Sequence, residues 1–373
     1  MDGQLIPTRP TGLSLKPLSR VSPSLGASLQ TCELAVAFRL DKRYAFLDTS
    51  APASVLGTVA HELAELTASG RFDSIADDQL EAELDRAWLV TLAPRETDFA
   101  NEHPFAPVPA PQRWPGYQQT RVRTLTLLAH EIRQRRASAS GSSVSASPLL
   151  EIPLKPDGIP LHGRADRVER HGNEVDIVDL KTGWTLGDEL KPAHRKQLLA
   201  YAYLWHATHN EWPTTASIQR LDGTRISFVV DPTEAEAAAA ELIAALNVFN
   251  QHIATEDIQA LASPGAAACR HCSYRAVCRP FFNDINPDWD WWKVCCIGTV
   301  TSVAKNRAAG RLTVDVLAGN TSESAVNVIN VPAASIPPLG AVISIVDAIR
   351  RRPSQDLQLT WETTLCRWAD GAF

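Results

Sequence analysis

Gly163-Arg164-Ala165-Asp166, followed by Asp179-Leu180-Lys181, is the most informative pair of runs in this chain. The residues between these two runs predict a β-hairpin, with β-branched residues on both arms and a two-residue turn at Gly172-Asn173. With that turn, residues whose numbers add to 345 pair, so Asp166 lies opposite Asp179. Opposed side chains share one face, with Cβ atoms about 5 Å apart. We therefore expect two neighbouring carboxylates on one face of a sheet.

Two carboxylates this close repel each other unless a cation lies between them. Lys181 follows Asp179 by two residues, so strand alternation places its ammonium on the same face. Two acids and a lysine suit a Mg²⁺ site that hydrolyses phosphodiesters. Such a short motif also arises by chance. The chain contains a second copy, Glu189-Leu190-Lys191, which lacks a preceding apolar strand and which we interpret as a solvated helix start before Pro192.

Two further runs flank the hairpin. Upstream, Gly57-Thr58-Val59-Ala60-His61-Glu62-Leu63-Ala64-Glu65 predicts a helix that carries His61 in its first turns. Downstream, Gln197 and Tyr201 lie four residues apart on one face of an apolar helix. Taken in chain order, these runs resemble the RecB-like branch of the PD-(D/E)XK nuclease superfamily. That branch has a G-x-x-x-H-x-x-x-E helix, a G-x-x-D strand, a D-x-K strand and a Q-x-x-x-Y helix.

The resemblance implies a fold, a metal and roles for the residues. The fold would be α/β, with a restriction-endonuclease-like mixed sheet flanked by helices. Mg²⁺ or Mn²⁺ would be held by His61, Asp166, Asp179 and the backbone carbonyl of Leu180. Lys181 would orient or activate the attacking water, and Gln197 and Tyr201 would support the lysine and the DNA strand. Glu151, on the preceding strand, would add an outer-shell carboxylate.

The second group of interest is the cysteines. The chain has seven, an odd number, with no signal peptide and no apolar run long enough to cross a bilayer, so we expect a cytoplasmic protein without disulfides. Cys269, Cys272 and Cys278 lie close together among basic residues. Three thiolates at this spacing predict a soft metal whose fourth ligand comes from elsewhere. A Cys₄ zinc site and free buried thiols remain alternatives. The other three cysteines after the hairpin, Cys295, Cys296 and Cys366, fit buried apolar positions.

The family resemblance supplies a fourth ligand. In the iron–sulfur members, such as AddB-like nucleases and the CRISPR-adaptation exonucleases, one cysteine lies near the N-terminus and three lie at the C-terminus. Here Ser22-Pro23-Ser24 and Leu29-Gln30-Thr31-Cys32 match the N-terminal part of that pattern. The resemblance therefore implies a structural [4Fe–4S] cluster held by Cys32, Cys269, Cys272 and Cys278. Closing so long a loop would restrain the unfolded chain.

Length and patterning predict two domains. With 373 residues, we expect a nuclease domain over 1–283 and a β-rich domain over 284–373. The nuclease domain would contain a helical part (1–148, extended over 1–24), a catalytic core (149–255) and the cysteine clip of Cys32 with 269–278. Helices are predicted near 26–42, 56–69, 77–92, 117–137 and 233–254, a Ser/Ala-rich linker over 137–147, and strands near 149–155, 161–170, 174–182, 215–221 and 225–231. Short strands near 294–303, 311–318, 324–331, 341–349 and 356–364 favour a small OB-like barrel.

Charge is distributed unevenly. The net charge of −6 is unusual for a DNA-binding protein, but an acidic remainder fits a site that gathers carboxylates. Six arginines lie between Pro111 and Ser140 against one acid, which predicts either a helix face that follows phosphates or an ordinary solvated face. In the β-rich part, the run Arg350-Arg351-Arg352 favours nucleic acid, whereas Trp289, Trp291 and Trp292 favour packing between the domains.

Together these patterns predict a Mg²⁺- or Mn²⁺-dependent deoxyribonuclease that acts on DNA ends or single strands, in repair, recombination or phage defence. The alternative is a non-catalytic, nuclease-like subunit that clamps DNA for a partner helicase; a hydrolase of RNA is a third interpretation. No Walker A motif occurs, so any motor must be a separate protein.

Overall fold

The computed structural model describes residues 6–139, 149–182, 190–255 and 260–369. Its first sheet has the order β1-β2-β3-β4-β5. The strands are β1 Leu149–Leu154, β2 Gly163–His171, β3 Glu174–Lys181, β4 Thr215–Arg220 and β5 Arg225–Val229. Neighbouring strands are antiparallel except β3 and β4, which are parallel. The predicted mixed α/β architecture is therefore found in this part of the chain.

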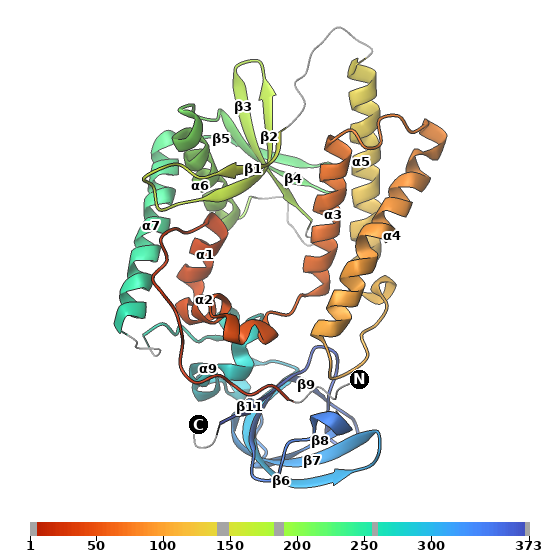
Figure 1. The fold of residues 1–373 in the computed structure, drawn as a ribbon, viewed down its shortest axis with the longest axis vertical. Helices are drawn as coiled ribbons and strands as arrows, with labels where there is room; N and C mark the ends of the chain where they lie inside the picture. The colour runs from red at the N-terminus through yellow and green to blue at the C-terminus, as the bar shows by residue number, and fades with distance from the viewer. Residues whose placement is uncertain (1–5, 140–148, 183–189, 256–259, 370–373) are drawn as a thin grey trace.

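A first group of helices packs against one side of this sheet. The helix α6 (Pro192–His209) supplies the crossover that the parallel pair β3 and β4 requires. The helix α7 (Pro232–Thr255) packs along α6 and against α1 (Pro23–Thr31). In Figure 1, α1, α6 and α7 stand together on one side of the sheet. Buried alanines on the α7 face, including Ala235 and Ala239, allow the helices to approach closely.

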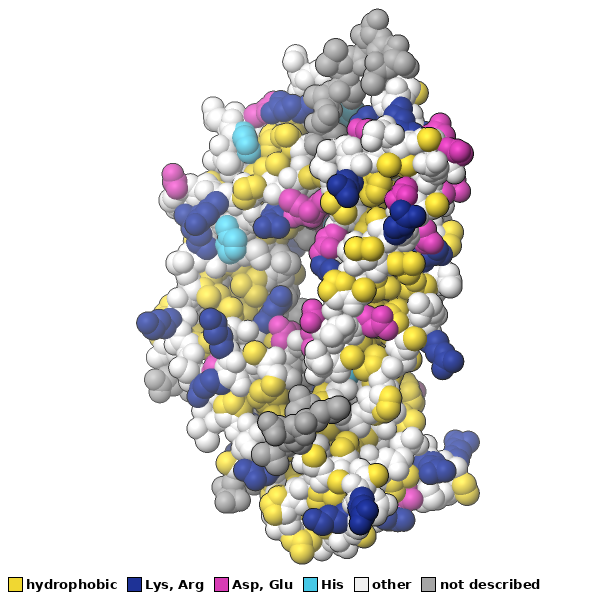
Figure 2. Space-filling model, turned by 45° about the vertical axis from the view of Figure 1, so that its right-hand side comes forward, with side chains coloured by type: hydrophobic (Ala, Val, Ile, Leu, Met, Phe, Trp, Pro, Cys, Tyr) yellow, Lys and Arg dark blue, Asp and Glu magenta, His cyan; other side chains and the backbone are white. Residues whose placement is uncertain are grey.

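A second helical layer stands on the other side. It consists of α3 (Pro52–Ala68), α4 (Asp77–Glu102) and α5 (Tyr117–Ala139), with α3 packed against both partners. The layer has its own core, in which Leu63, Trp88 and Ile132 are fully buried. The space-filling view shows the surface hollowed between this layer and the sheet side, with acidic side chains along the edges (Figure 2).

The predicted helix over 26–42 is two helices. The break is at Cys32, whose backbone is extended (φ −164°, ψ 108°), and α2 (Glu33–Leu40) begins directly after it. The amide of Leu34 donates to the carbonyl of Leu261, at 2.8 Å, so a contact from a distant segment replaces a helical hydrogen bond. The break turns Cys32 toward the cysteine-containing segment that follows Leu261.

The predicted helix over 77–92 extends to Glu102 despite Pro94 in its interior. Its buried stripe, which includes Trp88 and Leu92, continues to Phe99. Phe99 packs against Trp114, with ring centroids 4.7 Å apart. This packing outweighs the helix-breaking tendency of proline, because it extends the buried face by almost two turns.

The N-terminal segment before α1 is extended, as predicted, over its described residues. Thr8 forms an isolated bridge to Arg367, and Val21 forms another to Leu161. The segment therefore contacts both the C-terminal β-rich part and the turn before β2. The predicted linker over 137–147 begins inside α5, which runs to Ala139, and residues 140–148 lie outside the described residues.

The C-terminal part is built mainly from strands. They are β6 Val294–Lys305, β7 Ala309–Gly319, β8 Ala325–Pro332, β9 Val342–Arg350, β10 Leu357–Gln358 and β11 Thr364–Trp368. Their order is β10-β8-β7-β6-β9-β11, and β10 also pairs with β9. The pairing of β10 is parallel with β8 and antiparallel with β9. The four predicted strands from 294 to 349 are found, whereas the run predicted over 356–364 forms parts of two short strands.

Short helical turns connect the larger elements: α8 Ala266–Cys269, α9 Arg279–Asp284, and the 3₁₀ turns η1 Lys42–Leu47, η2 Pro111–Arg113, η3 Ser273–Val277, η4 Pro287–Trp289 and η5 Ala333–Ser335. The sheet core includes Cys295, Val346 and Trp368 of the β-rich part, so the two parts share buried packing. The interior of the β-rich part forms a third core. Among the described helices, none is long and apolar enough to cross a membrane.

Candidate active site

The hairpin of β2 and β3 has the predicted register. Its pairs run from Arg167 with Val178 to His171 with Glu174, so every pair adds to 345. Gly172 in the turn has φ +65°, a conformation that glycine adopts at little cost. One step beyond the pair of Arg167 and Val178, the same numbering places Asp166 across from Asp179, and the charge of Asp179 acts on Asp166. The amide of Leu180 donates to Asp166 Oδ2 at 3.0 Å, which fixes the direction of that carboxylate.

The predicted lysine lies beside the second aspartate. Lys181 Nζ is 2.8 Å from Asp179 Oδ2 and donates to Gln197 Oε1 at 3.3 Å. Gln197 belongs to α6, so this contact connects the crossover helix to the last residue of β3. The lysine ammonium is therefore held between a strand partner and a helix partner, on the face predicted from the sequence.

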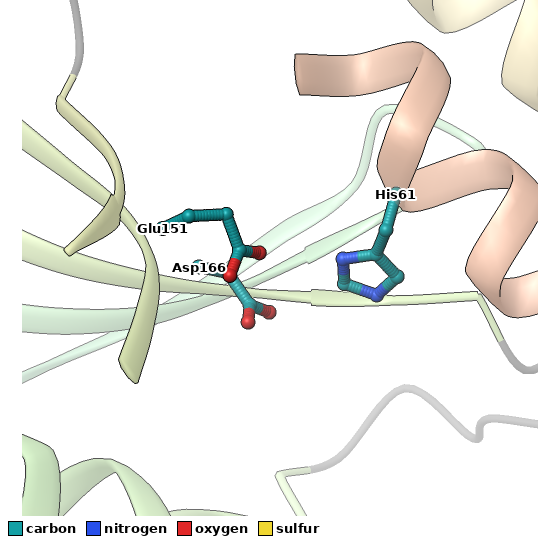
Figure 3. A group of neighbouring side chains, drawn as sticks. All are labelled: His61, Glu151 and Asp166. Carbon is teal, nitrogen blue, oxygen red and sulfur yellow. The ribbon is translucent and has the colours of Figure 1, made fainter. Parts of the chain in front are cut away.

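Three potential ligands converge where α3 faces the sheet. His61, Glu151 and Asp166 each place one donor atom within 4.8 Å of the other two, and this is the one such group of three or more among the described residues. In Figure 3, the His61 ring extends from α3 toward the two carboxylates. An octahedral Mg²⁺ site places opposite ligand atoms about 4.2 Å apart, so this spacing suits a shared ion.

Glu151, expected as an outer-shell carboxylate, lies within this group of potential ligands. It lies opposite Asp166, between the pairs Leu150 with Arg167 and Ile152 with Ala165, and its φ is +49°. A non-glycine residue rarely adopts this conformation, and such residues occur often at functional sites. The positive φ interrupts the strand at Glu151, and no sequence signal marks it.

Glu65 is a further acid at this site. It lies one helical turn after His61 and lines the same pocket as Glu151 and Asp166. Partial burial and the charge of Glu151 raise its pKa. The helix motif contains this glutamate, but no role follows for it from the sequence.

Burial and the charge of Asp179 raise the pKa of Asp166 to about 6, although His61 and the Leu180 amide act in the opposite direction. Asp179 is 6% exposed, and its Oδ2 is a buried atom that accepts no well-aligned hydrogen bond, even though Lys181 is close. A crowded pair of carboxylates with an unsatisfied oxygen is an arrangement that a divalent cation would stabilise. The residues present therefore fit a metal ion.

Tyr201 lies beside the first strand of the hairpin. Burial, followed by the charges of Asp166 and Asp179, raises the pKa of its phenol to about 12. The hydroxyl is therefore protonated at neutral pH, and its hydrogen-bond partner is the Gln197 side chain. The ring occupies the space next to Gly163, where an added Cβ would lie 2.8 Å from Tyr201 Cε1. The glycine of the G-x-x-D run thus allows the tyrosine to approach the strand.

The four cysteines assigned to a cluster line one pocket, together with apolar residues such as Phe38 and Phe281. Cys32 comes from the break between α1 and α2, and the others come from the segment around α8 and η3. Burial raises the pKa of Cys269 and Cys278, and raises that of Cys272 to about 11. The described part of the chain has no three cysteine sulfurs all within 4.8 Å of one another.

Most arginines on the basic face of α5 form ion pairs with acidic residues of this same chain. Arg121 pairs with Asp85, and three more α5 arginines pair with acids of α4 or of the preceding turn: Arg133 with Glu81, Arg135 with Asp73, and Arg136 with Asp77. These ion pairs connect the helices of the layer. The interpretation of this face as a surface that follows phosphates loses its main support, because four of the six arginines already have carboxylate partners.

The tryptophans of the segment after α9 divide into two groups. Trp289 and Trp291 pack against each other and against Phe281, with ring centroids 5.2 to 6.1 Å apart. This is the packing between the two parts of the chain that the sequence favoured. Trp292, in contrast, is 70% exposed.

The comparisons with known proteins identify the family. The sequence model described as the PD-(D/E)XK nuclease superfamily matches residues 20–279. The chain belongs to this superfamily. Members of the superfamily are generally nucleases, and they usually use Mg²⁺ or Mn²⁺. The matched residues contain the hairpin, α3, α6 and all four clustered cysteines.

Solved structures also match, 15 chains in all. One is titled "Crystal structure of SSO0001"; it is 14% identical, has a TM-score of 0.23, and the match covers 44% of this chain and 78% of that chain. No curated protein matches the chain at a significant level.

Proposed function

We propose that this nuclease-superfamily protein is a Mg²⁺- or Mn²⁺-dependent deoxyribonuclease of the RecB-like type that cleaves DNA at ends or in single strands. The observation that carries the proposal is that His61, Glu151 and Asp166 line one pocket within 4.8 Å of one another. The neighbouring Asp179 raises the pKa of Asp166 and pairs with Lys181. Repair, recombination or phage defence, with a helicase as partner, is the setting that follows from the family resemblance.

His61, Glu151 and Asp166 would hold the ion, and Asp179, which lies outside this close group of three, would be the neighbouring carboxylate. A bound Mg²⁺ or Mn²⁺ would lower the pKa of the water that it binds and would polarise the phosphate. Lys181 carries a positive charge beside Asp179 and would counter the charge that develops on the phosphate oxygens. Gln197 accepts a hydrogen bond from Lys181 and so restricts the position of its ammonium. Tyr201, protonated at neutral pH, can donate a hydrogen bond to the scissile strand.

A structural [4Fe–4S] cluster bound by the four clustered cysteines is part of the proposal. Their shared, apolar pocket supports a common ligand. In a tetrahedral zinc site, the sulfur atoms lie about 3.8 Å apart, which follows from Zn–S bonds of about 2.3 Å. The described cysteine sulfurs are spaced more widely than that, since no three of them are all within 4.8 Å of one another. A larger group, in which each thiolate binds a different iron, fits the wider spacing better.

The C-terminal part is proposed to be an OB-like barrel that forms its own domain from about residue 284. Support comes from the strand pairings, which connect β6, β7, β8, β10 and β9 and return to β6. A five-stranded ring with a single parallel contact, between β8 and β10, agrees with that architecture. Its interior is a separate hydrophobic core that includes Val314 and Ile345.

The assay for the proposed activity uses the full chain with labelled single-stranded DNA, blunt duplex and RNA, in Mg²⁺, Mn²⁺ or EDTA. We expect cleavage of DNA that EDTA blocks and that Asp179→Ala and Lys181→Ala remove while the fold, measured by circular dichroism, is retained. An Asp179→Ala protein that cuts at the parent rate would refute the assignment of the site. Metal-independent binding of DNA without cleavage would favour the non-catalytic subunit instead, and cleavage of RNA alone would favour the third interpretation.

A further inference from the structure

A cavity of about 350 Å³ lies where the helical layer meets the β-rich part. This volume is at the lower end of the range for pockets that bind small molecules. Its wall comes from the start of α3, the residue that follows α4, the cysteine segment and the strands β9 and β11. The residues that matter for its chemistry are His103, Arg270, Lys293, Trp291, Trp292 and Trp361.

The aromatic residues of the cavity differ in how firmly they are held. Trp361 packs edge-on against His103, with ring centroids 5.3 Å apart and an interplanar angle of 88°. Trp291 packs against Arg275, whose guanidinium carbon lies 5.6 Å from the ring centroid. Trp292 is 70% exposed, and the ammonium of Lys293 lies 5.1 Å from its ring. An exposed indole beside two anchored ones offers a stacking surface.

Among the charged residues that line the cavity, Arg270 is a cation that could contact a bound phosphate. The two acids among its lining residues are already engaged, because Asp347 receives both guanidinium nitrogens of Arg275, at 3.0 and 2.7 Å, and Glu362 pairs with Lys293 at 2.9 Å. Arg270 is exposed and has no acidic partner within the described ranges. An exposed indole and an exposed guanidinium that line one cavity are the combination that binds a base and its phosphate.

The cavity is also within reach of the candidate active site. Pro52, the first residue of α3, lines the cavity, and His61 lies nine residues further along the same helix. At about 1.5 Å per residue, the two are about 13 Å apart along the helix axis. A stacked strand rises about 3.4 Å per nucleotide, so about four nucleotides would connect the two places.

From these observations we infer that the cavity is a second nucleic-acid site, which holds a nucleotide of a single strand by stacking on Trp292 and by contact of Arg270 with a phosphate. The inference rests on the proposed nuclease function, because it assigns the cavity to the strand that enters the active site. A single strand is favoured over a duplex because stacking on Trp292 requires an exposed base face.

The test measures binding and cleavage separately. The full chain is titrated against a fluorescein-labelled oligothymidine of about twelve nucleotides in EDTA, and fluorescence anisotropy reports binding. Trp292→Ala is expected to weaken binding at least about fivefold, whereas Trp292→Phe, which keeps a ring, retains most of it. Arg270→Ala should weaken binding and lower the slope of log K against log salt by about 0.7.

Two controls separate this site from general effects. Arg307, exposed on the turn between β6 and β7 and outside the cavity, is the matched arginine, and Arg307→Ala should bind as the parent does. Hydrolysis of the small phosphodiester bis(p-nitrophenyl) phosphate in Mn²⁺ should be unchanged in Trp292→Ala, because that substrate is too short to extend from the active site to the cavity.

Each result counts for or against the inference. Equal binding by Trp292→Ala and the parent would overturn it, as would displacement of the oligonucleotide by polyglutamate as effectively as by unlabelled oligothymidine. If the parent cleaves DNA but both cavity variants bind normally, the inference fails while the proposed function stands. If binding depends on Trp292 but no cleavage occurs in any metal, the inference stands and the proposed function fails.

Discussion

Replacing Gly163 with alanine tests whether the first strand of the hairpin positions Tyr201. An ideal Cβ at Gly163 would lie 2.8 Å from Tyr201 Cε1 and 3.1 Å from Leu204 Cδ1, whereas carbon atoms in ordinary contact lie about 3.5–4.0 Å apart. Overpacking of this kind costs about 1–3 kcal/mol. For a domain of about 150–250 residues, each kcal/mol lowers Tm by about 2–4 °C, so we expect a decrease of roughly 2–12 °C.

The double-mutant cycle with Tyr201→Ala makes the cause specific. Removing the ring opens the space next to residue 163, so Gly163→Ala should cost less in the Tyr201→Ala background, with a coupling energy of about 0.5–3 kcal/mol. Thermal unfolding followed by circular dichroism gives the four Tm values. Gly265 is the matched control, because its φ of 177° suits any residue and nothing lies within 4 Å of an added Cβ. Unchanged stability of Gly163→Ala, or strictly additive effects of the two substitutions, would show that no steric contact with Tyr201 limits residue 163.

Three further predictions concern charge, metal and cysteine. Burial raises the pKa of Glu169, but the charges of Arg167 and Arg225 outweigh burial and hold this pKa below its ordinary value of 4.5. The carboxylate of Glu169 therefore stabilises the fold above about pH 4.5, and this stabilisation is lost as the pH falls through the pKa of the folded state. Glu169→Gln should remove that part of the acid dependence of Tm. Mg²⁺ at about 100 times its Kd should stabilise the parent protein by about 2.7 kcal/mol, and a thermal-shift assay should show no such increase for Asp166→Asn. Cys32→Ser should lower both the absorbance near 400 nm and the iron content of anaerobically purified protein; unchanged iron would contradict the four-cysteine assignment.

The hairpin could be predicted from the sequence because its determinants are local. Gly172-Asn173 fixes the turn, and strand alternation then determines which side chains share a face. The observed register, from Arg167 with Val178 to His171 with Glu174, follows from those two facts. The pairing of Lys181 with Asp179 is equally local, since the two residues are separated by one position on the same strand.

What the sequence did not reveal depends on contacts between distant segments. The break at Cys32 accompanies a hydrogen bond from Leu34 to Leu261, and no local signal encodes it. The use of the α5 arginines as partners for α4 acids depends on how the two helices pack. The position of Glu151 among the candidate ligands depends on a positive φ that the sequence does not mark. In each case, tertiary contacts select one local conformation or one set of partners, and the local sequence alone does not favour it.

The site depends on how closely α3 approaches the sheet, because His61 is on α3 while Asp166 and Asp179 are on β2 and β3. Gly57 lies one helical turn before His61 and so faces the same direction. A Cβ at Gly57 would lie 2.9 Å from Thr182 Oγ1, immediately after β3 ends. The absence of a side chain at Gly57 therefore allows α3 to contact the end of the strand that carries Asp179 and Lys181. The four-residue spacing between Gly57 and His61 thus has a physical cause: the glycine sets the distance between helix and sheet, and the histidine extends across it.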